Sequence, residues 1–255
     1  MQRAAVESFV EHTSIGRVVI PPKVPPGFRL FYTTIDFDGC IDDRIRRVVN
    51  DVTLVTCRQV HGATVHYAEP EPGSHDEEPE CDALWTDTRH VALAIKVADC
   101  LPVSIIDPKN FVIANIHSGW RSAAQNITAT TLGAMKFDPA AAFAFLGPSI
   151  RVCCFEVGEE VAAQFDPRFV DRTLGAKPHV DIPAMTIEIL RDRGFADIVD
   201  TELCTKCGNE VSGFRGLAVS EVDTARLRNL ATSEPLFHSY RRDKRSGRNL
   251  AIVAQ

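Results

Sequence analysis

The chain has 255 residues, of which 45% are hydrophobic and 24% are charged, and these values are typical of a soluble globular protein. The formal net charge of -6 argues against a nucleic-acid-binding protein, because such proteins usually carry a basic surplus. The sequence has no apolar run of about 18 residues and no signal-peptide core, so we expect a cytoplasmic protein without a membrane span.

Short strands around one helix are expected in the first third of the chain. The first 28 residues are predicted to form an edge element and a proline-rich loop. Apolar and β-branched runs predict strands at residues 28–35, 52–56 and 64–68, and an arginine-rich segment predicts a short helix at 42–50. Residues 69–80 are acidic and rich in proline, which indicates a solvated loop.

Apolar runs in the middle of the chain predict buried strands at residues 91–97, 101–106 and 111–116. The second run begins directly after Cys100, and the third ends at His117. At such strand ends a rigid scaffold meets open surface, and catalytic residues are often found there. A helix at residues 122–135 and a strand at 142–146 are expected to follow.

The C-terminal part of the chain is predicted to mix helices, strands and irregular segments. Helices are expected at residues 157–165 and 182–193, with Gly194 closing the second one. Strands are expected at 196–203 and 249–254, and the polar stretch 208–235 is expected to be irregular except for a short helix at 223–230. We find neither an internal repeat nor a linker, so we predict one domain over residues 1–255.

His61, Cys100 and His117 form the most informative set of side chains, because each stands beside small or turn-forming residues. Two imidazoles and one thiolate make a three-ligand zinc set that leaves a fourth position open. An open position is typical of a catalytic metal site, and we therefore predict an enzyme. Asp99 would then be a catalytic base or would orient a ligand, unless it is only a turn residue.

A metal-free alternative uses the same residues. Cys100 would be a nucleophile and His117 its base, as in a cysteine hydrolase. Metal binding needs His61 as well, whereas a Cys-His pair needs a carboxylate or an amide to orient the histidine. Two core histidines and a buried thiol remain the plain structural alternative.

Candidate anion and base contacts surround these residues. Arg121 follows Gly119 at a predicted helix start, which is suited to phosphate or carboxylate. Trp120 is either a stacking face for a base or a core residue. Glu156 would orient a ribose hydroxyl or a metal ligand, or would be a helix N-terminal charge. Candidate anion ligands in the basic cluster near the C-terminus are Arg241 and Arg242, which would otherwise form surface ion pairs.

The remaining cysteines are expected to be free thiols rather than metal ligands or disulfides. The chain has eight cysteines, which are too few for a disulfide scaffold. Cys204 and Cys207 form one CxxC pair, and a single pair is weak evidence for structural zinc, so we expect two thiols in a turn. Cys153 and Cys154 are adjacent and are interpreted as packing residues, because neighbours do not easily bind one metal ion.

Eight short segments, in this order, resemble one family. They are Gln59 to Gly62, Cys81 to Thr86, Ala98 to Pro102, His117 to Arg121, Leu146 to Pro148, Cys154 to Glu159, Leu203 to Thr205 and Ser239 to Asp243. The resemblance covers roughly residues 55–255. The family is the YfiH-like (DUF152) group, once named multicopper polyphenol oxidase or laccase-domain proteins.

The resemblance implies an α+β fold with mixed sheets and flanking helices, as in the YfiH and CNF-toxin folds. It implies a zinc site at His61, Cys100 and His117. The implied activity is phosphorolysis of adenosine, inosine and methylthioadenosine together with adenosine deamination, so that a nucleoside and phosphate are the partners. Catalytic residues are then expected at Asp99, Cys100 and Arg121. Substrate-binding residues are expected at Gln59, Trp120, Glu156, Arg241 and Arg242.

Other activities attributed to the family remain alternatives. Some relatives are linked to peptidoglycan precursor editing, which fits the cysteine-type amide hydrolase. A multicopper oxidase needs many histidines, commonly in His-x-His pairs, and this chain has eight histidines without such a pair. Copper would still bind such ligands in vitro, because its affinity for nitrogen and sulfur exceeds that of zinc.

Three departures from the family pattern bear on the substrate. A Ser-Leu-Asn-type motif usual near the N-terminus is replaced by residues 33–39, from Thr33 to Gly39. Ser122 stands where a glycine is usual, and Phe155 stands where a tyrosine is usual. The altered N-terminal loop supports a third hypothesis, in which the chain is a member of the family that binds a metal ion but catalyses no reaction.

Overall fold

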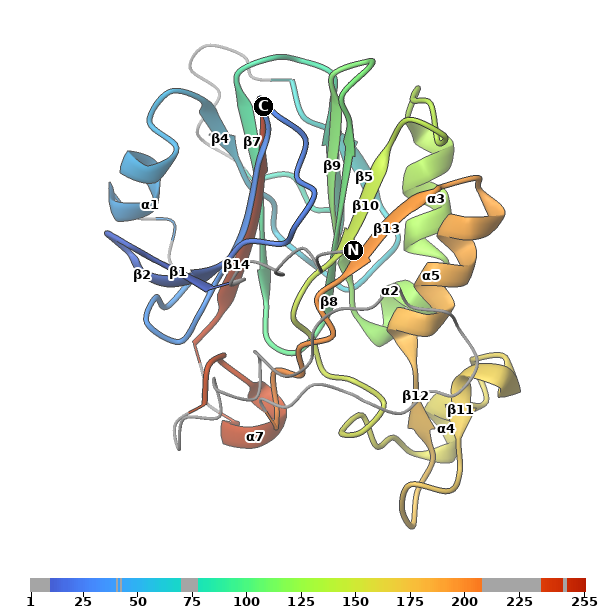
Figure 1. Cartoon of the computed structure of the whole chain (residues 1–255). Helices are drawn as coiled ribbons and strands as arrows, with labels where there is room; N and C mark the ends of the chain where they lie inside the picture. Colours follow the sequence, from blue (N-terminus) through green and yellow to red (C-terminus); the bar gives the residue numbers. More distant parts are fainter. Residues whose placement is uncertain (1–9, 40, 42, 70–77, 208–234, 245–246) are drawn as a thin grey trace, which may run out of the picture.

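Two six-stranded β-sheets pack face to face in the part of the chain that the computed structural model describes, which comprises residues 10–39, 41, 43–69, 78–207, 235–244 and 247–255 (Figure 1). The first sheet has the order β1 (Val10–Thr13), β2 (Gly16–Val19), β3 (Arg29–Thr33), β14 (Asn249–Ala254), β7 (Val91–Val97) and β4 (Thr53–Val55). The second has the order β13 (Asp197–Asp200), β10 (Phe143–Leu146), β8 (Leu101–Asp107), β9 (Val112–Ser118), β6 (Ala83–Thr86) and β5 (Val65–Tyr67).

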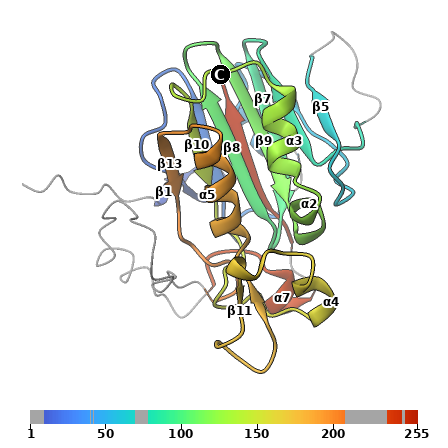
Figure 2. The same cartoon turned by 90° about the vertical axis from the view of Figure 1, so that its right-hand side faces the viewer.

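Helices lie on the outer faces of this sandwich. α1 (Asp43–Val48) lies beside the first sheet, and α3 (Ile127–Ala134) and α5 (Ile182–Asp192) cover the second sheet (Figure 2). α2 (Trp120–Ala124) lies beside the second sheet next to α3. Shorter elements extend beyond one end of the sheets: α4 (Glu159–Ala162), η1 (Pro167–Phe169), the ribbon of β11 (Val170–Asp171) and β12 (His179–Val180), and α7 (Tyr240–Asp243). None of the helices within the described ranges is long and apolar enough to cross a membrane.

The central strands are buried along their whole length and consist mostly of apolar residues, because both of their faces are covered. Every residue of β8, β9 and β14 is buried. Such continuous apolar runs are expected where each sheet covers one face of the other and helices cover the remaining face. Across the interface between the sheets, the Asn115 amide donates to the carbonyl oxygens of Leu93 and Ala251, at 3.0 and 2.8 Å. This buried amide therefore ties β9 to both β7 and β14.

The predicted α+β fold with mixed sheets and flanking helices is confirmed, with two corrections to the helices. The helix expected at residues 122–135 is two helices, because Asn126 has a φ of 59° and ends α2 before α3 begins. The helix expected at 157–165 is shorter and spans Glu159–Ala162, because the N–H groups of Gln164 and Phe165 bond three residues back rather than four. Gly194, with a φ of 91°, follows α5 as predicted. The helix predicted at 223–230 lies outside the described residues.

Candidate active site

Three strand-end segments bring His61, Cys100 and His117 to one place. Cys100 directly precedes β8, and His117 is the penultimate residue of β9, which pairs with β8 in antiparallel register. The potential ligand atoms of the three residues all lie within 4.8 Å of one another. The two imidazole rings meet edge to face, with centroids 4.9 Å apart. The set predicted from the sequence is therefore assembled by the fold.

Asp82 orients two of these three residues and was not singled out by the sequence. Its carboxylate is fully buried, and its Oδ1 lies 2.8 Å from Nδ1 of His117. The backbone N–H groups of His61 and Gly62 donate to the same carboxylate at 2.9 and 2.7 Å. A histidine held at Nδ1 presents Nε2 as its free ligand atom, which is the usual arrangement around a bound metal ion.

Gly119 provides the space above these ligands. A Cβ atom at this position would lie 2.9 Å from Sγ of Cys100 and 3.3 Å from Cδ2 of His61. The first of these distances is shorter than real Cβ contacts, so a larger residue would displace a ligand. Glycine is needed here for close packing around the three side chains.

Cys100 and His117 shift each other's protonation. Burial raises the pKa of Cys100, but the charge and hydrogen bond of His117 and a hydrogen bond from His61 outweigh it and lower the pKa to about 6. Burial lowers the pKa of His117, but the Cys100 thiolate and the Asp82 carboxylate outweigh it and raise the pKa to about 9. Without a metal ion, the two groups therefore form a thiolate–imidazolium pair near neutral pH.

A cavity of about 370 Å³ opens beside these residues, and His61 and Cys100 form part of its wall. This volume lies within the range of roughly 300–1,000 Å³ that is usual for small-molecule sites. Its apolar wall includes Trp120, Phe155 and Ile182, and its charged wall includes Arg121, Arg241 and Arg248. The cavity therefore combines aromatic surface with positive charge.

Asp99 lines the cavity, but both of its oxygens have partners. The Thr205 hydroxyl donates to Oδ1 at 2.6 Å, and the backbone N–H of Arg241 donates to Oδ2 at 2.8 Å. These contacts tie two distant segments to the residue next to Cys100. They favour a positioning role for Asp99 over proton transfer.

Trp120, Arg121 and Arg241 lie where the sequence analysis expected contacts with a substrate. All three line the cavity, and the Arg121 guanidinium lies 4.3 Å from the centroid of the Trp120 ring. Arg241 also donates from its guanidinium to the carbonyl oxygen of Glu156 at 2.7 Å. Within the described part of the chain this is the one hydrogen bond that its guanidinium makes, so other N–H donors of Arg241 can contact an anion.

The other three expected substrate contacts are Gln59, Glu156 and Arg242, and each has a partner within the protein. The Gln59 amide makes two hydrogen bonds of 2.8 Å to the backbone of Lys96, which fixes the His61 turn to β7. The Glu156 carboxylate faces Lys177 at 3.5 Å. The Arg242 guanidinium donates to the carbonyl oxygens of Thr205, Lys206 and Phe237 and to the carboxylate of Asp243. Among the described residues, these three side chains do not line the cavity.

The sequence analysis did not identify Arg248 as a cavity residue, because its position in the cavity wall depends on contacts with the N-terminal loop. Its backbone N–H donates to Asp38 Oδ1 at 3.0 Å, and its carbonyl oxygen accepts from the Gly39 N–H at 2.7 Å. The segment that departs from the family pattern, residues 33–39, thus places a cationic residue in the cavity wall. No spacing in the sequence connects these segments.

Comparisons with known proteins place these features in one family. The family model of the multi-copper polyphenol oxidoreductase laccases matches residues 36–255. A purine nucleoside phosphorylase of Aquifex aeolicus is 34% identical over 139 residues, which are 53% of this chain and 65% of that protein. A purine nucleoside phosphorylase of Xylella fastidiosa is 30% identical over 232 residues, which are 84% of this chain and 78% of that protein.

Two further similarities concern an enzyme and a solved structure. The adenosine deaminase RL5 of an unknown prokaryotic organism is 30% identical over 172 residues, 60% of this chain and 66% of that protein. The crystal structure of YlmD from Geobacillus stearothermophilus superposes with a TM-score of 0.73 at 22% identity, covering 98% of this chain and 99% of that one. At this identity the structural match supports the fold alone.

Proposed function

Because the chain belongs to the multi-copper polyphenol oxidoreductase laccase family, we propose that it is a zinc-dependent enzyme of purine nucleosides. The observation that carries the proposal is an open three-ligand set in the wall of a cavity bordered by three arginines. The relatives named purine nucleoside phosphorylase and adenosine deaminase supply the substrate class. The proposed reactions are phosphorolysis of adenosine, inosine and methylthioadenosine, and deamination of adenosine.

The donor set fits zinc better than a cluster of copper ions. His61, Cys100 and His117 would hold the ion, and the Asp82 contact prepares His117 for this role. When bound, zinc supplies Lewis acidity, which polarises a substrate oxygen or makes a water molecule more acidic. Within the described residues, the other group of potential ligands consists of four cysteines, so no second histidine site supports a multicopper centre.

The residues around the cavity suit the two substrates. Arg121 and Arg241 present guanidinium groups that bind phosphate through paired N–H donors. Trp120 and Phe155 offer aromatic faces on which a purine base can stack. The Ser118 hydroxyl is buried at the cavity wall without a hydrogen-bond partner in the described part of the chain, and it is positioned to bind a ligand.

Product chromatography tests this proposal directly. Zinc-loaded protein is incubated with adenosine, with and without phosphate. Phosphorolysis breaks the bond between C1′ and the base and joins C1′ to a phosphate oxygen, so adenine should appear only with phosphate. Deamination replaces the amino group with oxygen from water and releases ammonia, so inosine should accumulate without phosphate, whereas with phosphate part of it should be converted to hypoxanthine. Cys100→Ala should abolish both products, and neither product from zinc-loaded wild type would refute the proposal.

One observation favours a second candidate function. Asp82, His117 and Cys100 are connected as carboxylate, imidazole and low-pKa thiol, which is the order found in cysteine hydrolases. This candidate is a metal-independent amide hydrolase that acts on cell-wall precursors. Removing zinc with a strong chelator separates the two functions. If the protein is the nucleoside enzyme, the chelator should abolish its nucleoside activity. If it is the hydrolase, its amide-cleaving activity should survive the chelator and should be lost only after alkylation of Cys100.

A further inference from the structure

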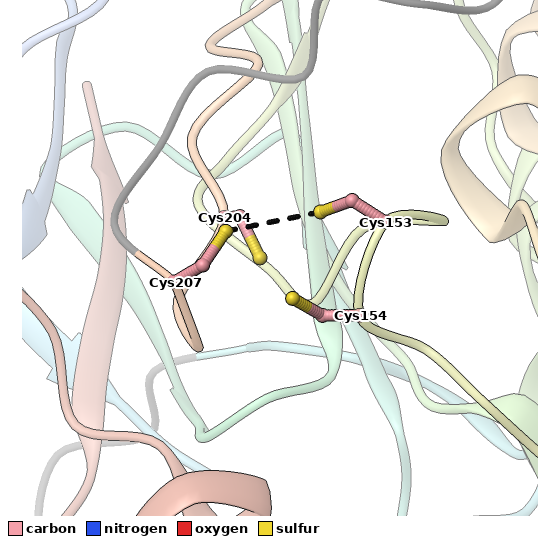
Figure 3. A group of neighbouring side chains, drawn as sticks. All are labelled: Cys153, Cys154, Cys204 and Cys207. Carbon is pink, nitrogen blue, oxygen red and sulfur yellow. Dashed lines mark hydrogen bonds between the residues drawn. The ribbon is translucent and has the colours of Figure 1, made fainter. Parts of the chain in front are cut away.

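Four cysteines outside the active site meet at one point between two segments that are distant in the sequence (Figure 3). Cys153 and Cys154 lie in a turn after β10, and Cys204 and Cys207 lie in a turn after β13. Because β10 and β13 are neighbouring parallel strands, the segments that follow them leave the same end of the sheet. All four Sγ atoms lie within 4.8 Å of one another.

The expectation that Cys153 and Cys154 are packing residues is wrong for Cys153, which is exposed. Cys154 is half-buried and packs against the hydrophobic core, as expected. Successive side chains of an extended strand point to opposite faces, but here the backbone turns, and the N–H of Cys154 donates to the carbonyl oxygen of Arg151 at 2.8 Å. This turn lets adjacent residues direct both sulfur atoms toward Cys204 and Cys207, as Figure 3 shows.

One of the sulfur–sulfur distances equals that of a tetrahedral zinc site, and the other sulfur atoms lie within 4.8 Å of one another. A Zn–S bond of about 2.3 Å in a tetrahedron places neighbouring sulfur atoms about 3.8 Å apart. The Sγ atoms of Cys153 and Cys207 are 3.8 Å apart. We propose that Cys153, Cys154, Cys204 and Cys207 bind a structural zinc ion. With four protein ligands this site is closed, in contrast to the three-ligand set of the active site.

Two of the four thiols have shifted pKa values because they form hydrogen bonds within the group. Hydrogen bonds from Cys153 and Cys207 outweigh burial and hold the pKa of Cys204 well below its usual value. The hydrogen bond to Cys204 raises the pKa of Cys153 in turn. Binding of zinc releases the remaining protons, because thiolates are the ligands.

The proposed ion would join two segments that border the active-site cavity. Thr205, between two of the ligands, donates to Asp99 beside Cys100, and Arg242 donates to the carbonyl oxygens of Thr205 and Lys206. Phe155, which follows Cys154, lines the cavity. The ion would therefore hold the wall of the cavity without contacting a substrate. This inference concerns metal binding and stands apart from the proposed nucleoside activity.

Metal analysis of the full chain tests the proposal. The double variant Cys100→Ala/His117→Ala removes the active-site ligands, and after purification with zinc under reducing conditions we expect about one zinc ion per chain. X-ray absorption should show sulfur neighbours only, at about 2.3 Å. Adding Cys153→Ser and Cys207→Ser should remove this zinc. Cys57→Ala is the control, because Cys57 is a buried thiol outside both groups, and it should leave the zinc content unchanged.

Three results would overturn the proposal. The first is a folded double variant that retains no zinc. The second is a Cys153–Cys207 disulfide in protein that was never exposed to oxidant. The third is a retained zinc ion with nitrogen or oxygen neighbours. If the double variant does not fold, the wild type decides. A zinc ion with four sulfur neighbours supports the site, whether or not a second ion is bound, and a single ion with one sulfur and two nitrogen neighbours overturns it.

Discussion

The Nδ1 atom of His117 lies 2.8 Å from Oδ1 of Asp82, and this carboxylate also accepts hydrogen bonds from the backbone of the His61 turn. One buried carboxylate thus fixes the ring of one ligand and the backbone of another. Its position explains how two segments separated by more than 50 residues present their imidazoles to the same point. The geometry of the site depends on a residue that would not itself touch the metal ion.

Asp82→Asn should weaken zinc binding by about 10–100-fold, the usual effect of removing a group that orients a ligand. Asparagine retains one acceptor oxygen but loses the charge and the second acceptor that serve the His61 turn. Competition with a chromogenic chelator would measure the affinity. Asp197→Asn is the matched control, because Asp197 pairs with Lys23 at the surface. The zinc affinity of this variant should equal that of the wild type.

Gly119→Ala should weaken zinc binding by about 1–3 kcal/mol, the usual cost of overpacking a filled site. The added methyl group would lie 2.9 Å from Sγ of Cys100. Zinc titration of the metal-free variant would measure the loss. Gly133→Ala is the matched control, since its Cβ would meet no atom within 4 Å. Because Gly133 lies in α3, that change should raise the free energy of unfolding by roughly 0.5–1 kcal/mol and leave zinc binding unaltered.

Alkylation of Cys100 in the metal-free protein should be half-maximal near pH 6. The pKa of this thiol is lowered from 9.0 to about 6, so the reactive thiolate forms as the pH rises through 6 rather than through 9. Mass spectrometry of the peptide that contains Cys100 would follow the reaction with iodoacetamide. His117→Ala should move the midpoint upward, because burial then acts on the thiol without the imidazolium. Zinc should protect the wild type at every pH, and an unprotected Cys100 would contradict the ligand assignment.

Arg121→Ala should raise the KM for phosphate by about 10–100-fold, since a hydrogen bond to a charged group is worth about 1.5–3 kcal/mol. Adenosine deamination, which needs no phosphate, should change much less. Steady-state kinetics with varied phosphate would separate the two effects. Arg172→Ala is the control, because Arg172 pairs with Glu159 at the surface. An equal loss of both activities would show that Arg121 supports the cavity as a whole rather than binding phosphate.

Local sequence was sufficient to predict the elements that carry the metal ligands. The apolar runs around residues 91–116 predict β7, β8 and β9, because strands buried on both faces tolerate few polar side chains. The ligand types at His61, Cys100 and His117 indicated an open zinc set, because the chemistry of a ligand belongs to the residue. The short motifs that contain these ligands also occur in the order that is typical of a known family, and this order indicated the resemblance.

Tertiary structure alone decided which polar side chains face the cavity. Gln59, Glu156 and Arg242 stand in the same motifs as the ligands, yet their side chains bind backbone or surface groups. Asp82 and Arg248 take part because strands far apart in the sequence lie side by side. The four-cysteine group arises in the same way, since two turns leave neighbouring strands at the same sheet end. A sequence specifies ligand chemistry residue by residue, whereas distance between residues follows from how the whole chain packs.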